Sequence, residues 1–220
     1  MAGQPIGILG GTFDPVHNGH LRLAVELVQT LGLRELRLVP SARPPHRDSP
    51  GASPGQRAKW LRVAISGQPQ LRLDDCELLR DGPSYTVDTL ASLRADLPDT
   101  PLCLVMGRDV FAQLPQWDRW HRLLAFAHIV LVERPGVNPP LPAPVESELT
   151  ARGEPDPGAL AQTLAGRIHV CSPPPLEISS TRIRALLAQG KSPRYLLPDL
   201  VLDDILDAGV YRGGQGDSAP

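Results

Sequence analysis

The chain has 220 residues, which is long enough to bury a sizeable core in one domain. Its formal net charge of −2 at pH 7 gives no overall attraction for nucleic acid, so a phosphate ligand must be held by local geometry. Cysteine usage and the lack of a long apolar run exclude further classes. The cysteines Cys76, Cys103 and Cys171 are odd in number and form no CxxC pair, which favours a thiol-reduced cytoplasmic protein over a secreted or zinc protein. No run approaches the roughly 20 apolar residues of a membrane span, so we expect no membrane partner. Because of the net charge, we expect no nucleic-acid partner either.

Apolar runs typical of strands alternate with helical patterns along most of the chain. The expected strands are Gln4–Gly10, Glu35–Pro40, Gln70–Asp75, Leu102–Gly107, His128–Glu133 and Arg167–Cys171. The expected helices are Leu21–Leu31, Gln56–Ser66, Thr86–Leu97, a helical region containing Val110–Leu114, His121–Phe126, one after Ser179, and Leu200–Ala208. This alternation predicts an α/β fold, a Rossmann-like doubly wound parallel sheet with ligands at the carboxyl ends of its strands. We expect one domain over 1–212 with a small C-terminal helical part at about 179–212, and a disordered tail at 213–220.

Two proline-rich stretches interrupt the alternation, and both are expected to be loops. Pro135–Gly158 contains seven prolines and few apolar residues, and we interpret it as a disordered insertion without function. Pro40–Gly55 contains five prolines around Arg43, His46 and Arg47. Because it follows the second predicted strand, it is a candidate lid over phosphates, and a solvated basic loop is the alternative.

The segment Gly10–His20 joins the first predicted strand to the first predicted helix and contains paired glycines and two histidines. Free N–H groups at a helix start bind anions, and paired glycines let a phosphate approach the backbone. His17 and His20 lie one helical turn apart. With Asn18 as a candidate N-cap, both imidazoles can reach one cluster of oxygens and donate hydrogen bonds to it. A glycine turn with two surface histidines is the structural alternative.

A second motif, Ile178–Arg184, places three hydroxyl side chains directly before a helical pattern, where they are expected to form the N-cap. Its hydroxyls, free amides and an arginine could hold the outer phosphates of a nucleoside triphosphate, or could simply cap the helix. Arg182 and Arg184 are two positions apart and point to different sides of a helix. Only one of them is therefore expected to face the phosphates.

Three further features have both a binding and a structural interpretation. A helix beginning at Ser84–Thr86 offers free amides and a hydroxyl to a carboxylate, or is a plain cap. Trp117 could stack on a heteroaromatic ring, or belong with Trp120 to the core. Asp109, after a predicted strand, could accept ribose hydroxyls or cap the next helix.

The first motif resembles the GxFxPxHxGH signature of the HIGH-type nucleotidyltransferase superfamily. Ile178–Arg184 matches the ISSTxxR motif of its adenylyltransferases, and the sequence lacks the KMSKS loop of class I aminoacyl-tRNA synthetases. Other segments resemble bacterial nicotinate mononucleotide adenylyltransferases over most of the chain: Ser84-Tyr85-Thr86 with Asp88-Thr89-Leu90, Gly107-Arg108-Asp109, Pro115-Gln116-Trp117, Arg134-Pro135-Gly136 and Leu197-Pro198 to Gly209-Val210-Tyr211. The chain departs from that family at Asp204, where a tyrosine is usual, at Arg47, where PPHK has lysine, and in the long Pro135–Gly158 stretch.

The resemblance implies adenylyl transfer from ATP to nicotinate mononucleotide, giving nicotinate adenine dinucleotide and pyrophosphate. It assigns the catalytic contacts to His17 and His20. The ATP- and phosphate-binding residues that it implies are Gly10, Gly11, Thr12, Phe13, Arg47, Gly107, Asp109, Ile178, Ser180, Thr181 and Arg184, and those for the nicotinate nucleotide are Tyr85, Thr86 and Trp117. The attacking phosphate is already an anion, so no general base is expected. Mg²⁺ is expected to be bound mainly through ATP phosphates, without a dedicated protein cage.

Three alternatives stay open. Phosphopantetheine adenylyltransferases share the first motif, but they are shorter and lack the features at Ser84–Thr86 and Trp117. Nicotinamide mononucleotide differs from nicotinate mononucleotide only by an amide in place of the carboxylate. A nucleotide-binding regulator would bind ATP without releasing pyrophosphate. The sequence shows no heptad or exposed apolar stripe, so it predicts no particular oligomeric state.

Overall fold

The computed structural model describes residues 3–42, 51–134, 136, 139–174 and 176–212. The expectations about Arg43, His46 and Arg47, and about the tail at 213–220, lie outside the described residues. The described strands are β1 (Ile6–Gly11), β2 (Glu35–Pro40), β3 (Leu71–Leu73), β4 (Leu102–Gly107), β5 (His128–Val132) and β6 (Ile168–Cys171). The described helices are α1 (Asn18–Thr30), α2 (Pro54–Ala64), α3 (Thr86–Asp96), α4 (Arg108–Phe111), α5 (Leu123–Phe126), α6 (Ala143–Arg152), α7 (Ser180–Ala188) and α8 (Asp199–Asp207).

These strands form one parallel sheet in the order β3-β2-β1-β4-β5-β6. The predicted Rossmann-like α/β fold is therefore confirmed. The strand order reverses between β1 and β4, and an open α/β sheet binds ligands in the crevice at such a switch point. Gly10 pairs with Val39, and Leu9 pairs with Val105. This register brings the carboxyl ends of β2, β1 and β4 to the same edge, which we call the carboxyl edge of the sheet.

Helices cover both faces of the sheet and create two apolar clusters. Successive residues of β4 alternate between them, with Val105 in the first cluster and Leu104 and Met106 in the second. A parallel strand buried on both faces has an uninterrupted apolar sequence for this reason. Helices α1, α2, α7 and α8 contribute to the first cluster, and α3, α4, α5 and α6 to the second.

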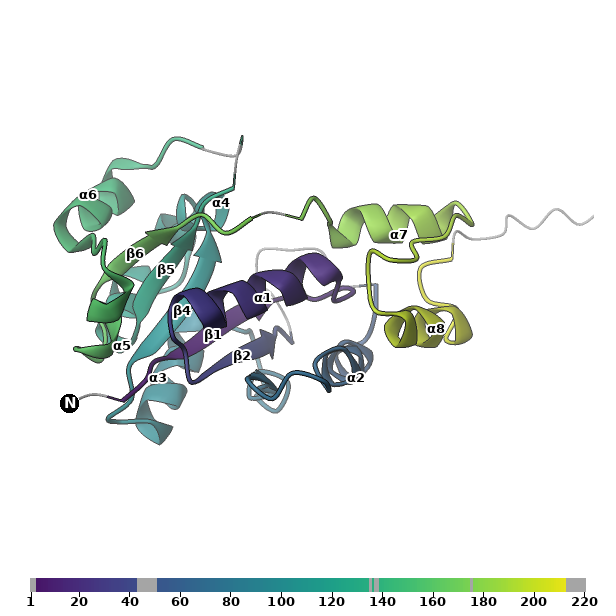
Figure 1. Cartoon of the computed structure of the whole chain (residues 1–220), viewed down its shortest axis with the longest axis horizontal. Coiled ribbons are helices and arrows are strands. Elements are labelled where there is room, and N and C mark those ends of the chain that lie inside the picture. The colour runs from purple at the N-terminus through teal and green to yellow at the C-terminus, as the bar shows by residue number, and fades with distance from the viewer. Residues whose placement is uncertain (1–2, 43–50, 135, 137–138, 175, 213–220) are drawn as a thin grey trace, which may run out of the picture.

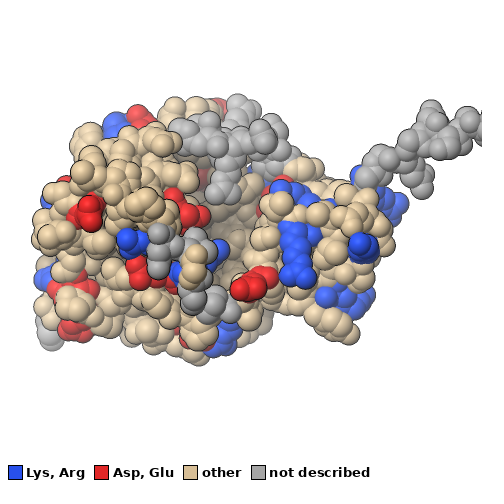
Figure 2. All heavy atoms as spheres, turned by 90° about the horizontal axis from the view of Figure 1, so that it is seen from above, with Lys and Arg blue, Asp and Glu red and all other residues tan. Residues whose placement is uncertain are grey.

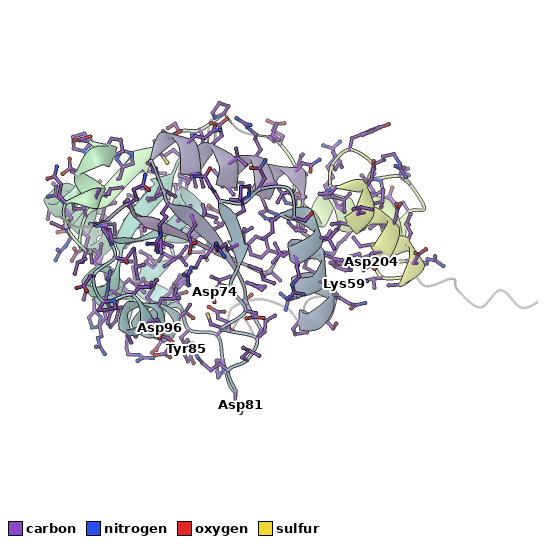
Figure 3. All side chains as sticks on the ribbon, turned by 60° about the horizontal axis from the view of Figure 1, so that its bottom comes forward. Lys59, Asp74, Asp81, Tyr85, Asp96 and Asp204 are labelled. Carbon is purple, nitrogen blue, oxygen red and sulfur yellow. The ribbon has the colours of Figure 1, made fainter. Side chains whose placement is uncertain are left out.

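The C-terminal helices α7 and α8 lie beside one end of the sheet, on the side to which the β2 arrow points (Figure 1). Ile183 of α7 and Ile205 of α8 join the same apolar cluster as Trp60 of α2. An ion pair between Lys59 and Asp204 also connects α2 to α8 (Figure 3). The C-terminal helical part therefore shares its core with one face of the sheet.

The expectation of a disordered insertion at Pro135–Gly158 is wrong, because its described residues include helix α6. Pro142 is the N-cap of this helix, and Pro144 lies in its first turn, where a missing N–H leaves no intrahelical bond unmade. Val145 is fully buried in the second cluster and fixes the helix to the sheet layer. Proline content identified the connection but not the helix inside it.

Other differences concern boundaries. The helical region expected around Val110–Leu114 is divided between α4, which ends at Phe111, and a 3₁₀ helix at Leu114–Gln116, and the third strand spans only Leu71–Leu73 rather than Gln70–Asp75. The remaining predicted strands and helices occur within a few residues of their expected bounds. Such shifts are usual at element ends, which fray and depend on tertiary contacts.

Candidate functional site

After the turn that follows β1, helix α1 is capped at its N-terminus by a histidine. His17 has extended backbone angles, φ −147° and ψ 167°, and its Nδ1 accepts a hydrogen bond from the N–H of His20 at 3.3 Å. The expectation that Asn18 would be the N-cap is therefore wrong. The Asn18 side chain instead donates to the carbonyl of Tyr195 at 2.9 Å, which attaches the helix start to the C-terminal part.

The two histidine rings stack on one another, with centroids 3.6 Å apart and planes inclined by 20°. Burial, followed by the charge of Arg134, lowers the pKa of His17 to about 4. Burial and the neighbouring His17 hold the pKa of His20 well below its usual range. Both imidazoles are thus neutral at pH 7. Since Nδ1 of His17 accepts a hydrogen bond, its proton must sit on Nε2, which makes Nε2 a hydrogen-bond donor.

His20 has a nitrogen that is not satisfied within the described part of the chain. Its Nδ1 is buried and has no hydrogen-bond partner among the described residues. Its ring also packs edge-on against Phe13, with centroids 5.0 Å apart and planes at 72°. Buried polar atoms are nearly always paired, so an unpaired one marks a place where a ligand can add a hydrogen bond.

The two sequence motifs meet at this turn, although they are far apart in the chain. Ser179 is the N-cap of α7, as predicted, and accepts from the N–H of Arg182 at 3.2 Å. The Ser180 hydroxyl donates to the carbonyl of Pro15 at 2.9 Å, which places the N-terminus of α7 against the β1–α1 turn. The first N–H groups of α7 have no intrahelical acceptor, and its positive dipole end favours an anion there.

The two arginines of the second motif have different surroundings. Arg184 donates through Nη1 to the carbonyl of Asp14 at 2.7 Å, and its Nη2 lies 3.4 Å from Oγ1 of Thr181. Arg182 is exposed. Of the two guanidinium groups, that of Arg184 is held beside the glycine turn.

A small pocket of about 50 Å³ opens beside the stacked histidines. It is lined by His17, His20 and Gly19 of the first motif, by Ile178 of the second, and by Arg134 after β5. Figure 2 shows a hollow between the larger and smaller parts of the molecule, with Lys and Arg side chains on its smaller-part side. No role for Arg134 was predicted from the sequence. A cation directly after an apolar strand was the signal that could have identified it.

The end of β4 lies beside that of β1 and carries Gly107 and Asp109. A Cβ atom on Gly107 would lie 2.5 Å from Oδ1 of Asp109, so a larger residue there would displace this carboxylate from its present position. Asp109 is exposed in the first turn of α4. Its carboxylate is therefore available at the carboxyl edge.

The residues expected to bind the nicotinate nucleotide lie around the start of α3. Tyr85 is the N-cap of this helix without a side-chain capping bond, and Thr86 is its first residue. Tyr85 and Trp117 are both half-buried and pack against the second apolar cluster. Arg119 donates through Nη2 to both oxygens of Asp88, at 2.8 and 2.9 Å, and ties the segment of Trp117 to α3. Trp117 is thus partly a core residue and keeps an accessible side.

The phosphate side and the α3 side are joined by hydrogen bonds after β2. The N–H of Ser41 donates to the carbonyl of Gly11 at 3.0 Å, and the N–H of Ala42 donates to the hydroxyl of Ser84 at 3.1 Å. Beneath Ser84, the buried carboxyl group of Glu77 accepts from Oγ1 of Thr89 at 2.7 Å, and burial raises its pKa. The carboxyl edge is therefore one connected surface from β1 to α3.

Arg57 supports the glycine turn from below and was missed by the sequence analysis. Its side chain is fully buried, donating through Nη1 to the carbonyl of Thr12 at 2.6 Å and through Nη2 to that of Ser41 at 2.8 Å. Nε of Arg57 has no hydrogen-bond partner among the described residues. A charged residue on the buried face of α2 gives no local sequence signal of such a role.

The described residues contain no group of three or more His, Cys, Asp or Glu side chains arranged to hold a metal ion. Both carboxylate oxygens of Asp14 accept backbone N–H groups, from Gly51 and Ala52. Within the described part of the chain, no helix is both long and apolar enough to cross a membrane.

Comparisons with known proteins agree with this geometry. The model of the family described as cytidylyltransferase-like matches residues 8–186. A relative from Aeromonas salmonicida, named "Probable nicotinate-nucleotide adenylyltransferase", is 48% identical over 96% of this chain and 99% of its own. A relative of the same name from Pseudomonas syringae pv. tomato is 50% identical over 98% of this chain and 97% of its own.

A solved structure shares the fold. Nicotinic acid mononucleotide adenylyltransferase from Plasmodium falciparum, complexed with NaAD, has a TM-score of 0.73 and 17% sequence identity, covering 95% of this chain and 98% of that one. At this identity the likeness establishes the fold alone.

Proposed function

This chain belongs to the cytidylyltransferase-like family, and from that premise we propose that it transfers the adenylyl group of ATP to nicotinate mononucleotide. The products are nicotinate adenine dinucleotide and pyrophosphate. Relatives about half identical over nearly the full chain carry the corresponding name. The observation that carries the proposal is the stacked, neutral pair of His17 and His20 at the switch point of the sheet, facing the N-terminus of α7.

The reaction that suits this site is an in-line displacement at the α-phosphorus of ATP. A phosphate oxygen of nicotinate mononucleotide forms the new P–O bond, and the bond to the α,β-bridging oxygen breaks as pyrophosphate leaves. The nucleophile is already an anion at neutral pH, so the protein supplies alignment and hydrogen bonds rather than a base. Neutral imidazoles suit this task, because Nε2–H of His17 donates to a phosphate oxygen and need not give up its proton.

The leaving pyrophosphate is assigned to the start of α7. The first N–H groups of this helix, at Ser180 and Thr181, together with the guanidinium of Arg184, would receive its charge as it develops. Arg134, which lines the same pocket as the histidines, would add positive charge on the other side. Mg²⁺ on the triphosphate oxygens would neutralise part of the charge on the ATP phosphates.

The rest of ATP is assigned to the ends of β1 and β4. Gly10 and Gly11 would allow close approach to the backbone, and Asp109 would accept the ribose hydroxyls. The remaining contacts proposed for ATP come from Thr12, Phe13, Gly107 and Ile178. Arg47, the further candidate for a phosphate contact, lies outside the described residues.

The acceptor nucleotide is assigned to the start of α3. Free N–H groups at Tyr85 and Thr86 would hold the nicotinate carboxylate, since a helix N-terminus favours an anion. Trp117 would stack on the pyridine ring from the segment that Arg119 ties to α3. A carboxylate receives more from these donors than an amide does, which favours nicotinate over nicotinamide.

The test is pyrophosphate release from ATP and Mg²⁺ with one acceptor at a time: nicotinate mononucleotide, nicotinamide mononucleotide or phosphopantetheine. We expect release with nicotinate mononucleotide at a kcat/KM well above those of the other two. A preference for nicotinamide mononucleotide would overturn the assignment of the carboxylate to α3. Binding of ATP without release from any acceptor would make the chain a nucleotide-binding protein and reject the reaction.

A further inference from the structure

Asp14, in the middle of the glycine turn, has a buried carboxylate that no step of the reaction requires. The residue is only 5% exposed. Oδ2 accepts from the N–H of Gly51 at 2.9 Å, and Oδ1 accepts from the N–H of Ala52 at 3.1 Å. Oδ1 also accepts from the hydroxyl of Tyr211, near the end of the described chain. One side chain thus joins the turn to the segment before α2 and to the segment after α8.

The residue next to Asp14 needs such support. Phe13 has a φ of +49°, in the left-handed region that residues other than glycine rarely adopt. The turn is held on both sides of it, because Arg57 binds the carbonyl of Thr12 and Arg184 binds that of Asp14. A strained conformation persists only where the surrounding contacts determine it.

The conformation of Phe13 reaches the reacting groups directly. Its ring packs edge-on against His20 and is itself buried. A shift of the Phe13 backbone would therefore move the face against which the His20 imidazole rests. In a close-packed interior, a displacement of a few tenths of an ångström is transmitted to the neighbouring ring.

Tyr211 is placed to hold Asp14 as a hydrogen-bond donor. Burial and the adjacent carboxylate of Asp14 raise the pKa of the Tyr211 hydroxyl, so it keeps its proton throughout the working pH range. Its ring lies so close to Gly51 that a Cβ there would be 2.8 Å from Cε1 of the ring. Trp60 contributes a tilted ring contact with centroids 6.2 Å apart.

We propose that Tyr211 is a positioning residue for adenylyl transfer: through its hydrogen bond to Asp14 it fixes the strained turn at Phe13 and thereby the orientation of the His20 imidazole. The proposal rests on the reaction assigned above. Tyr211 touches neither substrate, and its effect passes through protein contacts alone. The C-terminal segment is therefore part of what shapes the phosphate site.

The first test is Tyr211→Phe, which removes only the hydroxyl. Charge-assisted hydrogen bonds are strong, and small misplacements of reacting groups slow catalysis, so kcat should fall about tenfold. KM for nicotinate mononucleotide should stay within about twofold, because α3 holds that substrate apart from the turn. Tyr195→Phe is the matched control, because Tyr195 is 81% exposed and should leave all parameters unchanged.

A double variant separates positioning from simple loss of stability. If Tyr211 acts through His20, Tyr211→Phe should have almost no further effect on kcat in a His20→Ala background. A residue that only stabilises the fold would lower kcat by the same factor in both backgrounds. That result, or a kcat of Tyr211→Phe within twofold of the unmodified chain, would overturn the proposal.

Gly51→Ala tests the same hydrogen bond by displacing the Tyr211 ring instead of removing its hydroxyl. The added methyl group should displace the Tyr211 ring and reproduce the effect of Tyr211→Phe, while the backbone N–H to Asp14 is kept. Gly55→Ala is its control, because a Cβ at Gly55 would meet no atom within 4 Å. Loss of activity in both glycine variants, or in neither, would contradict the mechanism.

A measurement without turnover distinguishes failure of this inference from failure of the assigned reaction. The ring proton resonances of His20, identified by their loss in His20→Ala, should move in Tyr211→Phe and not in Tyr195→Phe. If the unmodified chain releases no pyrophosphate with any acceptor, the reaction is rejected, and these resonances still decide the role of Tyr211. Unmoved resonances would reject positioning whatever the activity.

Discussion

Arginine and histidine side chains form hydrogen bonds at both ends of the strands, but the two ends differ in whether those bonds are complete within the protein. We call the edge at which the strands begin the amino edge of the sheet. At the amino edge, Arg94 donates to carbonyls that precede three strands, those of Thr100 at 2.7 Å, Phe126 at 2.8 Å and Leu164 at 2.8 Å. His128 is buried there, with Nε2 2.9 Å from the carbonyl of Thr163 and Nδ1 accepting a backbone N–H. Each of these groups has its partners within the protein.

The carboxyl edge has buried histidines as well, but their hydrogen bonding is incomplete. Burial lowers the pKa of His128 as it lowers those of His17 and His20, so a shifted pKa does not distinguish the two edges. The difference is that Nδ1 of His20 is unpaired among the described residues, in the same region as the start of α7, whose first N–H groups have no intrahelical acceptor. The unpaired nitrogen of His20 therefore supports our assignment of the functional site to the carboxyl edge, because a buried polar group without a protein partner can receive one from a ligand.

The strongest way to break this comparison is to make the same substitution at both edges. His20→Gln should lower kcat about 10² to 10³-fold, the usual effect of removing one donor from a charged transition state, with little change in stability. His128→Gln should leave kcat unchanged and lower the free energy of unfolding by about 1 to 3 kcal/mol, because a backbone N–H loses its acceptor. Steady-state pyrophosphate release and urea denaturation measure the two effects.

The control is His121→Gln, since His121 is exposed and is not among the residues assigned to either edge, so it should change neither quantity. If His20→Gln mainly destabilised the fold, or if His128→Gln mainly lowered kcat, the division between edges would be wrong.

The lowered pKa values of the buried histidines should make the folded protein less stable in acid. His17 has a pKa of about 4 in the folded protein and about 6.5 when unfolded, so between these values only the unfolded chain takes up the proton. Stability should therefore rise with pH from about 4 to 6.5 and be level above, with His17 contributing about 3 kcal/mol. Denaturant unfolding at a series of pH values measures this slope.

His17→Asn removes one titrating group and keeps a side chain suited to an N-cap. The slope between pH 4 and 6.5 should become shallower in this variant, with His20 and His128 retaining part of it. An unchanged slope would mean that His17 is charged in the folded protein.

At the amino edge, Arg94→Lys tests whether the guanidinium fork is needed. A lysine amine cannot reach carbonyls before three strands at once, so the free energy of unfolding should fall by about 2 kcal/mol. For a chain of this length that corresponds to a Tm lower by about 4 to 8 °C, with kcat unchanged. Arg62→Lys, at an exposed position of α2, is the matched control. If Arg94→Lys lowered kcat at temperatures well below its Tm, the amino edge would also affect catalysis, and the division between the two edges would be wrong.

Much of the fold could be predicted because strand and helix periodicity is a local property. The run Leu102–Gly107 predicted β4 with its observed bounds, and Glu35–Pro40 did the same for β2. Helix α6 could not be predicted in this way, because its prolines look like loop signals and its stability depends on burying Val145 in a distant core. Tertiary packing overrides local composition in such a segment.

The site follows the same division. His17 and His20 could be proposed as functional residues because their spacing within one motif is visible in the sequence, as is the hydroxyl cap at Ser179. Their supports could not be proposed. Tyr211 reaches Asp14 across a separation of 197 residues, and the sequence does not specify such a pair. Local motifs predict the groups that we assign to binding, and the contacts that we propose to orient them appear only in three dimensions.

The smallest expected effect concerns Asp204, where the related family usually has a tyrosine. Trp60 is fully buried, and its indole N–H donates to Oδ2 of Asp204 at 2.7 Å, while Lys59 pairs with the other oxygen. A tyrosine hydroxyl can also accept from an indole, so the position needs an acceptor rather than a charge. Asp204→Ala should lower the free energy of unfolding by about 1 to 2 kcal/mol, measured by urea denaturation, because it leaves the Trp60 N–H without this acceptor.

Asp204→Asn keeps an acceptor oxygen and loses only the exposed ion pair with Lys59, so its effect should be under about 1 kcal/mol. Lys59→Gln should match Asp204→Asn, since both remove the same ion pair and leave the Trp60 hydrogen bond in place. All three variants should retain kcat, because neither Lys59 nor Asp204 is among the residues assigned to ATP or to nicotinate mononucleotide. If Asp204→Asn destabilised as much as Asp204→Ala, the ion pair with Lys59 would be what holds α8 against α2. Aspartate at this position would then stabilise the contact through its charge and not as a replacement for the hydroxyl acceptor of a tyrosine.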